Sequence, residues 1–469
     1  MSEFLRYVLW EFRRYFVLAL IACLAAFAVL LGLSSFSRRK YGAERKFPWK
    51  RSMLLFAFLG YLLMVLFLTI LRASSLHSQV NFHLFRAWRE ALNNFSAHRW
   101  LNVMLNIAMF CPLGVLLPFL HRNFHKWYAA IPAGFGLSLC IELLQFLLSR
   151  GVCDVDDLFC NTLGTAIGYL TVMACISLFQ NPGKRWKPFL SYSSLLVLIL
   201  GSVGSVFLLY QVAEFGNLPQ APAYSMNTGD TNWILACDLH NGAVTAPVYQ
   251  TNTRTREDCD AFAEDFQHRI STVLDDISYY QEAAYYMDHG SEGGAHFLFV
   301  HYLDQGYEYS DIYDEEPVWA DTDRKILEEV LETYGISLPA SAEFAVLGDG
   351  WHSFTVSQQQ DGELFWDGVL RVRVCEDGSI REIENRLLSY FNYRQVEIIS
   401  PQRAYEQLTA GKFNDEGLFE RIKPPQVSIL SWSMEYRVDT KGFYQPVYVF
   451  EAASPEGNYN YSIVIPAIK

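Results

Sequence analysis

Six apolar runs of 18–22 residues fill most of the first 210 positions, and they limit the fold more than any other feature. Because a helix rises 1.5 Å per residue, about 20 apolar residues cross the hydrocarbon core of a bilayer. No small-residue cleavage site follows the first run, so we expect it to remain as an anchor. We predict six transmembrane helices, at Phe16–Leu33, Met53–Leu71, Leu101–Leu120, Tyr128–Leu148, Asn161–Phe179 and Phe189–Tyr210.

The two halves of the chain differ in charge. Residues 1–210 hold 20 Lys and Arg against 8 Asp and Glu, whereas residues 211–469 hold 17 against 42. Because one half is basic and apolar and the other is acidic and polar, the chain is not a single globular domain. The acidic half would repel phosphates, and the basic residues lie in short loops between apolar runs, so we expect no nucleic-acid partner.

The short loops also predict the orientation. Loops after the first, third and fifth runs share one side of the membrane and hold twelve Lys and Arg. The N-terminus and the loops after the second and fourth runs hold eight. Since cytoplasmic loops carry the excess of positive charge, we predict a multi-pass plasma-membrane protein with both termini, and residues 149–160, on the extracytoplasmic side.

The second half, residues 211–469, is predicted to be an α+β domain with an antiparallel sheet, entered through a linker at Asn217–Thr231 rich in Pro, Asn and Gly. Helical spacing is present at Arg256–Tyr286, Asp323–Tyr334 and the segment from Ser400 to Gly411. Strands are predicted at Glu363–Val374, which turns at Asp377-Gly378, and at Val427–Val438, Tyr444–Ala453 and Tyr459–Ile465. Cys237 and Cys259 are the nearest pair of outer cysteines in sequence, but no disulfide scaffold is indicated.

Polar residues recur inside the third and fourth runs. Asn102 and Asn106 lie four residues apart, and Glu142 and Gln145 lie three apart, so each pair shares a helix face. An ionisable Glu in hydrocarbon costs several kcal/mol, so we expect Glu142 to face the bundle, either protonated or paired. The cations nearest to Glu142 by depth are Arg150, in the following loop, and Arg72.

The loop after the fourth run is also polar. It contains Arg150, Asp154, Asp156 and Asp157, and Asn161 opens the fifth run. Asp154 or Asp156 would serve simply as a helix cap, but so many charges at one depth favour a functional site. We predict one outward-opening pocket in the outer third of the bilayer, formed by Arg72, Asn102, Asn106, Glu142, Gln145, Arg150, Asp154, Asp156, Asp157 and Asn161.

Four further residues have structural interpretations. Pro112 lacks an N–H group, so the third helix is predicted to be kinked or broken near its middle, with Gly114 just beyond. Gly164 and Gly168 form a Gly-x-x-x-Gly pattern, which is typical of closely packed membrane helices.

Several of these motifs occur together in a known family. LNIAMFCPLGVLLPFL, IELLQ, RGVCDVDDLFCN and TLGTAIGY follow one another in this order. They resemble the VanZ-like membrane proteins, which show an Asn-then-Pro-Leu-Gly helix, a Glu-x-x-Gln helix, an Arg…Asp-x-x-Asp loop and an Asn-x-x-Gly helix. Thr69 and Arg72 fit the usual opening of that family. The resemblance implies a domain at residues 51–180, between an N-terminal helix and loop (1–50) and a sixth helix (181–210).

The family is named for low-level resistance to teicoplanin-type glycopeptides, so the resemblance implies a bacterial cell-envelope protein but supplies no reaction. The long outer domain departs from minimal VanZ-like proteins. Within it, SPQRAYEQLTAGK and the strands ending in YQPVYVFEA are similar to PepSY-like or YycI-like modules, which pair a helix with a small antiparallel sheet. These modules imply a sensor or inhibitor fold with no catalytic residues to transfer.

The leading hypothesis is a protein that binds the head group of a lipid or lipid-linked wall precursor, or a lipidated antibiotic, without a demonstrated reaction. Arg72 and Arg150 would contact phosphate or carboxylate, and Asn106, Gln145 and Asn161 would donate hydrogen bonds. The Asp pair would alternatively hold a divalent cation that bridges to phosphate. We predict no resident metal or cofactor.

Two other classes compete with this hypothesis. In an intramembrane metal-assisted hydrolase or transferase, Glu142 would be the general base and Asp154, Asp156 and Asp157 the metal ligands. The spans contain no helical His-Glu-x-x-His and no Gly-x-Ser-x-Gly to support an enzyme. In a sensor or scaffold, residues 211–469 would bind an envelope protein.

Overall fold

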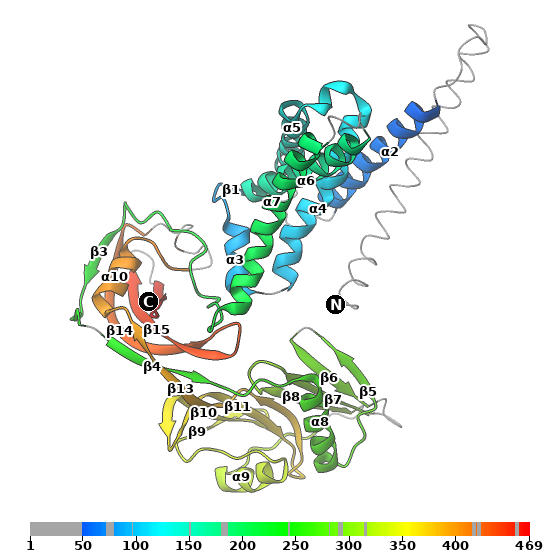
Figure 1. The fold of residues 1–469 in the computed structure, drawn as a ribbon. Coiled ribbons are helices and arrows are strands. Elements are labelled where there is room, and N and C mark those ends of the chain that lie inside the picture. The colour runs from blue at the N-terminus through cyan, green and yellow to red at the C-terminus, as the bar shows by residue number, and fades with distance from the viewer. Residues whose placement is uncertain are drawn as a thin grey trace, which may run out of the picture. The chain divides into compact units, whose positions relative to one another are not determined.

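The chain divides into two compact units, one ending at Ala213 and the other beginning at Glu214 (Figure 1). The first predicted span lies outside the residues described by the computed structural model, as do Arg72 and Arg150. The described residues are 49–71, 79–95, 97–149, 152–179, 186–242, 244–280, 282–288, 294–313, 317–414, 419, 424–454 and 459–469.

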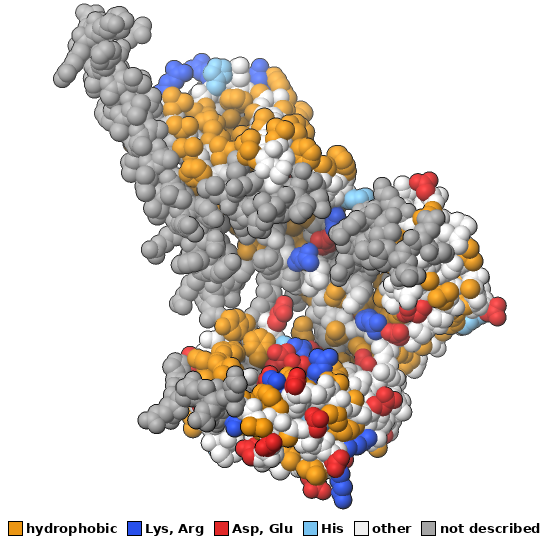
Figure 2. All heavy atoms as spheres, turned by 180° about the vertical axis from the view of Figure 1, so that it is seen from behind, with side chains coloured by type: hydrophobic (Ala, Val, Ile, Leu, Met, Phe, Trp, Pro, Cys, Tyr) orange, Lys and Arg blue, Asp and Glu red, His pale blue; other side chains and the backbone are white. Residues whose placement is uncertain are grey.

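The described part of the first unit contains five helices that are long and apolar enough to cross a membrane. They confirm the second to sixth predicted spans as apolar helices. Figure 2 shows hydrophobic side chains over much of the visible surface of this unit, with Lys, Arg and His at one end. The helices are α2 (Trp49–Leu66, continued by the π-helical turn η1, Phe67–Leu71), α4 (Ala97–Leu120), α5 (Trp127–Leu147), α6 (Val155–Leu178) and α7 (Trp186–Val212).

Two of these helices differ in part from prediction. Of the kink or break predicted at Pro112, the break is wrong, because α4 continues through both Pro112 and Pro118. A proline removes a single N–H donor, whereas a break would expose many backbone groups to hydrocarbon. The fifth span begins at Val155 rather than Asn161, because Asp154 caps the helix and places the next two aspartates in its first turn.

Helices α4 and α6 are in close backbone contact. A Cβ added at Gly164 would lie 2.0 Å from the carbonyl oxygen of Ile107, and one at Gly168 would lie 2.0 Å from that of Cys111. On α4, a Cβ at Gly114 would lie 2.0 Å from the carbonyl oxygen of Thr165. These three glycines therefore allow a helix contact that no larger residue would permit.

A short segment between α2 and α4 was not predicted from the sequence. It contains β1 (Gln79–Asn81) and α3 (Arg86–Asn94), and β1 pairs in parallel with β2 (Val152–Asp154), just before α6. Phe82 is 81% exposed, and α3 is amphipathic with Ala91 buried. An amphipathic helix beside exposed aromatic residues is typical of the membrane interface.

The second unit is built on a mixed sheet of 14 strands, in which the β14–β3 pair is parallel and the other ladders are antiparallel. The main order is β3-β14-β15-β4-β13-β11-β12-β8-β7-β6-β5, with β10 joining β11 to β9 and β16 beside β15. The strands are β3 (Asn232–Leu235), β4 (Val244–Gln250), β5 (Asp276–Tyr279), β6 (Ala283–Met287), β7 (Gly294–His301), β8 (Tyr307–Tyr313), β9 (Glu343–Gly348), β10 (Trp351–Asp361), β11 (Leu364–Val374), β12 (Ile380–Asn385), β13 (Leu388–Ile398), β14 (Gln426–Val438), β15 (Phe443–Ser454) and β16 (Tyr459–Pro466).

The described residues of this unit include the helices α8 (Arg256–Ile270), α9 (Arg324–Thr333) and α10 (Pro401–Thr409), and their apolar faces pack in its cores. The apolar faces of α8 and α9 share one core, and that of α10 lies in a second core. Cys259 is buried in the first core and Cys237 packs against the second, and both are free thiols. No disulfide therefore joins them.

Most predicted elements of this unit are confirmed. The α9, α10, β11, β12, β14, β15 and β16 segments lie where the sequence placed them. The prediction of one helix over Arg256–Tyr286 is wrong beyond Ile270, where Ser271 takes a left-handed conformation with φ of 54°. The Tyr-rich stretch that follows forms β5 and β6 instead, as expected for aromatic residues at a half-buried sheet.

The segment Asn217–Thr231 is not a free linker. Leu218 and Met226 are buried in the second unit. Just before it, the N–H of Gly216 donates to the buried carboxylate of Asp439 at 2.7 Å. Pro, Asn and Gly give this segment an irregular path, but its apolar residues attach it to the sheet.

Candidate functional site

The candidate site lies at the end of the helical bundle where α5 ends and α6 begins. Four residues there, Asp154 to Asp157, connect β2 to the first turn of α6. Three of the four are aspartates, and each has a different set of hydrogen-bond partners.

Asp154 holds three elements together. Its side chain caps α6 by accepting from the N–H of Asp156 at 2.8 Å. It also accepts from the side-chain amide of Asn81, on β1, at 3.0 Å. Its own N–H donates to Oε2 of Glu142, on α5, at 3.1 Å.

Asp156 is a structural cap for a different helix. Its two carboxylate oxygens accept from the N–H groups of Phe85 at 2.5 Å and Ala87 at 2.6 Å, at the start of α3. Phe85, the residue that precedes this helix, provides no side-chain cap. The carboxylate supplies the missing acceptor and its negative charge favours the N-terminal end of the helix dipole. Each oxygen accepts one of these two hydrogen bonds, so the carboxylate of Asp156 joins the start of α6 to the start of α3.

Glu142 and Asp157 are the remaining acids of the site. Glu142 is 3% exposed, so it faces the interior of the bundle rather than lipid. Asp157 accepts from the side-chain amide of Asn106, on α4. Between described residues, no Lys or Arg forms an ion pair with Glu142, Asp154, Asp156 or Asp157. The site is therefore acidic in its described part.

The predicted amide donors serve contacts between helices. Asn161 donates to the hydroxyl of Ser138 on α5 at 2.9 Å, and Gln145 donates to the carbonyl of Thr69 in the π turn at 3.0 Å. Such bonds join neighbouring membrane helices. The buried Oδ1 of Asn161 accepts no hydrogen bond from any described residue.

The structure thus brings together six of the predicted residues: Asn106, Glu142, Asp154, Asp156, Asp157 and Asn161. Gln145 contacts the π turn instead, and the side chain of Asn102 is exposed on α4. Sequence reasoning missed Ser138 and Asn81. Ser138 lies one helical turn before Glu142 on the same face, so its spacing was a usable signal, whereas Asn81 lies in a loop without periodicity.

Metal binding was the other prediction for the aspartates. Among the described residues, no group of three or more His, Cys, Asp or Glu side chains is placed to hold a metal ion. The hydrogen bonds explain this arrangement, because Asp154 and Asp156 point toward backbone N–H groups of different helices.

The fold and the site define a multi-pass helical membrane protein with an appended α+β domain. Residues 54–179 match the model of the VanZ/LLP1 family. The resemblance predicted for about residues 50–180 is therefore confirmed, and the matched region contains every described residue of the site.

A search of curated proteins gives no match. Among solved structures, the C-terminal domain of YpeB from Bacillus megaterium is similar at 14% sequence identity. The similarity covers 47% of this chain and 95% of that domain, with a TM-score of 0.17.

Proposed function

We propose that this VanZ-like envelope protein binds the head group of a lipid or lipid-linked wall precursor, or a lipidated glycopeptide, at the outer face of the plasma membrane. The observation that carries the proposal is the gathering of buried Glu142 and half-buried Asp154 and Asp157 at one end of an apolar bundle. Carboxylates in membrane helices are costly, and these three form no ion pair with a described Lys or Arg, which favours a functional role.

The chemistry of the site restricts the ligand. Carboxylates accept hydrogen bonds, and the amides of Asn106 and Asn161 already donate within the bundle. The ligand must therefore supply ammonium, amide or hydroxyl donors, as amino-sugar and peptide head groups do. If the ligand carries a phosphate, we propose that Arg72 and Arg150 contact it.

Depth supports access from the membrane surface. Glu142 lies five residues before the end of α5 at Leu147, which is about 7.5 Å along the helix. The neighbouring Leu143 and Leu144 are exposed on the surface of the bundle. A polyprenyl or acyl tail would remain in the bilayer beside such residues while its head group reaches the acids.

The proposal is tested by the variants Glu142→Gln and Asp157→Asn in cells challenged with teicoplanin-type glycopeptides. Each substitution keeps the side-chain size and removes the charge, so we expect glycopeptide tolerance to be lost while membrane abundance is unchanged. Arg150→Ala is expected to have the same effect. Asn102→Ala, one turn from Asn106 but exposed, is the matched control and retains tolerance. Unchanged tolerance in both acid variants would contradict a role for this site.

Binding is favoured over catalysis by one observation. The metal-assisted hydrolase or transferase requires Asp154, Asp156 and Asp157 to share an ion, whereas no group of three or more His, Cys, Asp or Glu among the described residues is placed to hold one. Metal analysis of the purified protein, with an assay of divalent-dependent lipid diphosphate turnover, separates the two classes. Expressing residues 1–210 alone tests the sensor or scaffold class, because that class requires the outer domain for the phenotype.

A further inference from the structure

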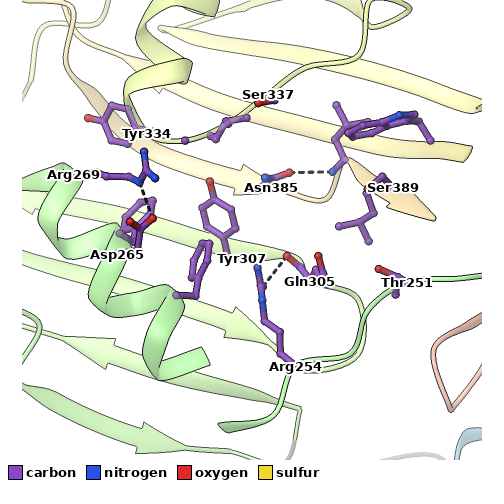
Figure 3. A pocket seen from close by; sticks show the side chains of 17 residues that line it. Thr251, Arg254, Asp265, Arg269, Gln305, Tyr307, Tyr334, Ser337, Asn385 and Ser389 are labelled. Carbon is purple, nitrogen blue, oxygen red and sulfur yellow. Dashed lines mark hydrogen bonds and ion pairs between the residues drawn. The ribbon is translucent and has the colours of Figure 1, made fainter. Parts of the chain in front are cut away.

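The second unit contains a cavity of about 220 Å³ that is separate from the acidic site (Figure 3). It lies between α8, the start of β8, the loop that follows α9, and the β12–β13 connection. Its walls combine aromatic and aliphatic side chains with two arginines, Arg254 and Arg269. A cavity in which apolar side chains stand beside a few converging polar groups is a candidate ligand site.

The two arginines differ in their partners. Arg269 forms an ion pair with Asp265, with Nε 2.8 Å from the carboxylate. Arg254 donates from Nη1 to the carbonyls of Gln305 at 2.8 Å and Gly306 at 3.4 Å. No carboxylate among the described residues pairs with it, and the nearby Asp304 is paired with Arg386 instead.

Arg254 is also partly removed from water. Its guanidinium lies 4.4 Å from the ring centre of Phe262, and burial lowers the pKa of the guanidinium from its usual value. A desolvated cation without a paired anion is unfavourable, so an anion that enters the cavity would relieve this cost. Carbonyl oxygens accept from Nη1, while no described residue accepts from Nε or Nη2, which are the groups that a carboxylate contacts in a bidentate pair.

The other walls define the rest of the ligand. Trp366 and Leu387 supply apolar surface to the cavity, and Thr251 and Ser389 supply hydroxyl groups (Figure 3). One unpaired cation matches the single charge of a carboxylate better than the double charge of a phosphate, particularly in a domain as acidic as this one.

We propose that this cavity binds a small carboxylate that carries an apolar substituent, with Arg254 as the charge partner. Free amino acids and the C-terminal residue of a peptide share this chemistry. This ligand is independent of the head group proposed for the membrane unit.

The test is calorimetric titration of the full-length protein in lipid nanodiscs with leucine and with acetyl-glycyl-leucine, each compared with its C-terminal amide. We expect an acid to bind and its amide to bind at least tenfold more weakly. Binding of leucine alone identifies a free amino acid as the ligand class, and binding of acetyl-glycyl-leucine identifies a peptide C-terminus. If neither acid binds, or if inorganic phosphate displaces the bound acid at a lower concentration, the proposal is wrong.

Variants locate the binding. Arg254→Gln removes charge-assisted hydrogen bonds and is expected to weaken binding about ten- to a hundredfold. Arg256→Gln is the matched control, because Arg256 lies over Tyr279 outside the cavity and its loss leaves binding unchanged. Ser337→Trp fills the cavity from an exposed position and is expected to abolish binding, even if Arg254→Gln does not fold. Wild-type affinity in Arg254→Gln or in Ser337→Trp would overturn the proposal.

Discussion

Single carboxylates determine the local structure of the membrane unit. Asp156 is 1% exposed and belongs to α6 by sequence, but its hydrogen bonds are made to α3, about 70 positions earlier in the chain. An anion at this place satisfies two backbone N–H groups and the helix dipole at once. Asp156 thus fixes the interfacial segment on the bundle.

We therefore expect Asp156→Ala to destabilise the membrane unit by about 2 kcal/mol, the upper value for loss of a helix cap. Thermal unfolding of the purified protein in detergent measures the effect. Glu90→Gln, which alters a half-exposed ion-pair partner on α3 itself, is the control and is expected to change stability by less than about 1 kcal/mol. Equal stability of Asp156→Ala and the wild type would show that the cap has no role.

We expect a half-buried histidine, His301, to make the second unit sensitive to acid. Burial, and secondarily the charge of Arg386, lower the pKa of His301 below its ordinary value of about 6.5. Since the unfolded chain then binds more protons, stability falls as pH decreases through about 6.5 toward the folded pKa. Chemical unfolding of the second unit at several pH values tests this, and His301→Gln should reduce the loss of stability between pH 7.5 and 5.5. An identical pH dependence in the variant would exclude this histidine as the cause.

At the scale of elements, the contact between α4 and α6 is the most demanding in the bundle. It requires glycine at three positions, and the helices approach until backbone carbonyls touch backbone. Membrane helices associate largely through such packing, because lipid provides no hydrophobic force between them.

We expect Gly164→Ala to destabilise the bundle by about 1–3 kcal/mol, since the added methyl would lie 2.0 Å from a carbonyl oxygen and the helices must separate. Gly204→Ala on α7 is a matched control, because its added Cβ has no neighbour within 4 Å. Thermal stability in detergent compares the two. Since Ala favours a helix more than Gly does, we expect no loss in Gly204→Ala. A loss of equal size in both variants would mean that this contact does not set the effect.

Sequence patterns predicted the positions of helices and strands better than the hydrogen-bond partners of their side chains. The apolar runs predicted five described membrane helices, and Ser400 with Pro401 predicted the start of α10. The segment around α3 escaped prediction because its cap comes from a distant residue, Asp156. Similarly, the amides of Asn161 and Gln145 could be placed on helix faces, but whether they bond a ligand or another helix depends on packing that spacing does not encode.

At the scale of the whole molecule, the two units have separate cores. The two large cores of the second unit contain residues from Phe215 onward. The two cores of the membrane unit contain residues from Phe58 to Phe207. The composition predicted this division, but it placed a linker where the structure has packed residues.

The second unit is therefore expected to fold without the membrane unit, provided that its first residues are retained. A fragment from Glu214 to Lys469 should be monomeric and unfold cooperatively, as measured by circular dichroism. A fragment that begins at Asn232 lacks buried Leu218 and Met226, and is expected to lose several kcal/mol of stability. Equal stability of the two fragments would show that residues 217–231 do not stabilise the domain and act as a linker.

The contact between α4 and α6 also has a consequence during biosynthesis, because its two helices are translated at different times. Helices α4 and α6 are separated in the chain by α5, so α4 leaves the ribosome before its closest neighbour has been translated. Before α6 is made, the face of α4 at Ile107 and Cys111 lacks the two glycines that pack against it in the folded protein. A nascent chain released before position 178 would therefore display a ready docking surface to quality-control proteases.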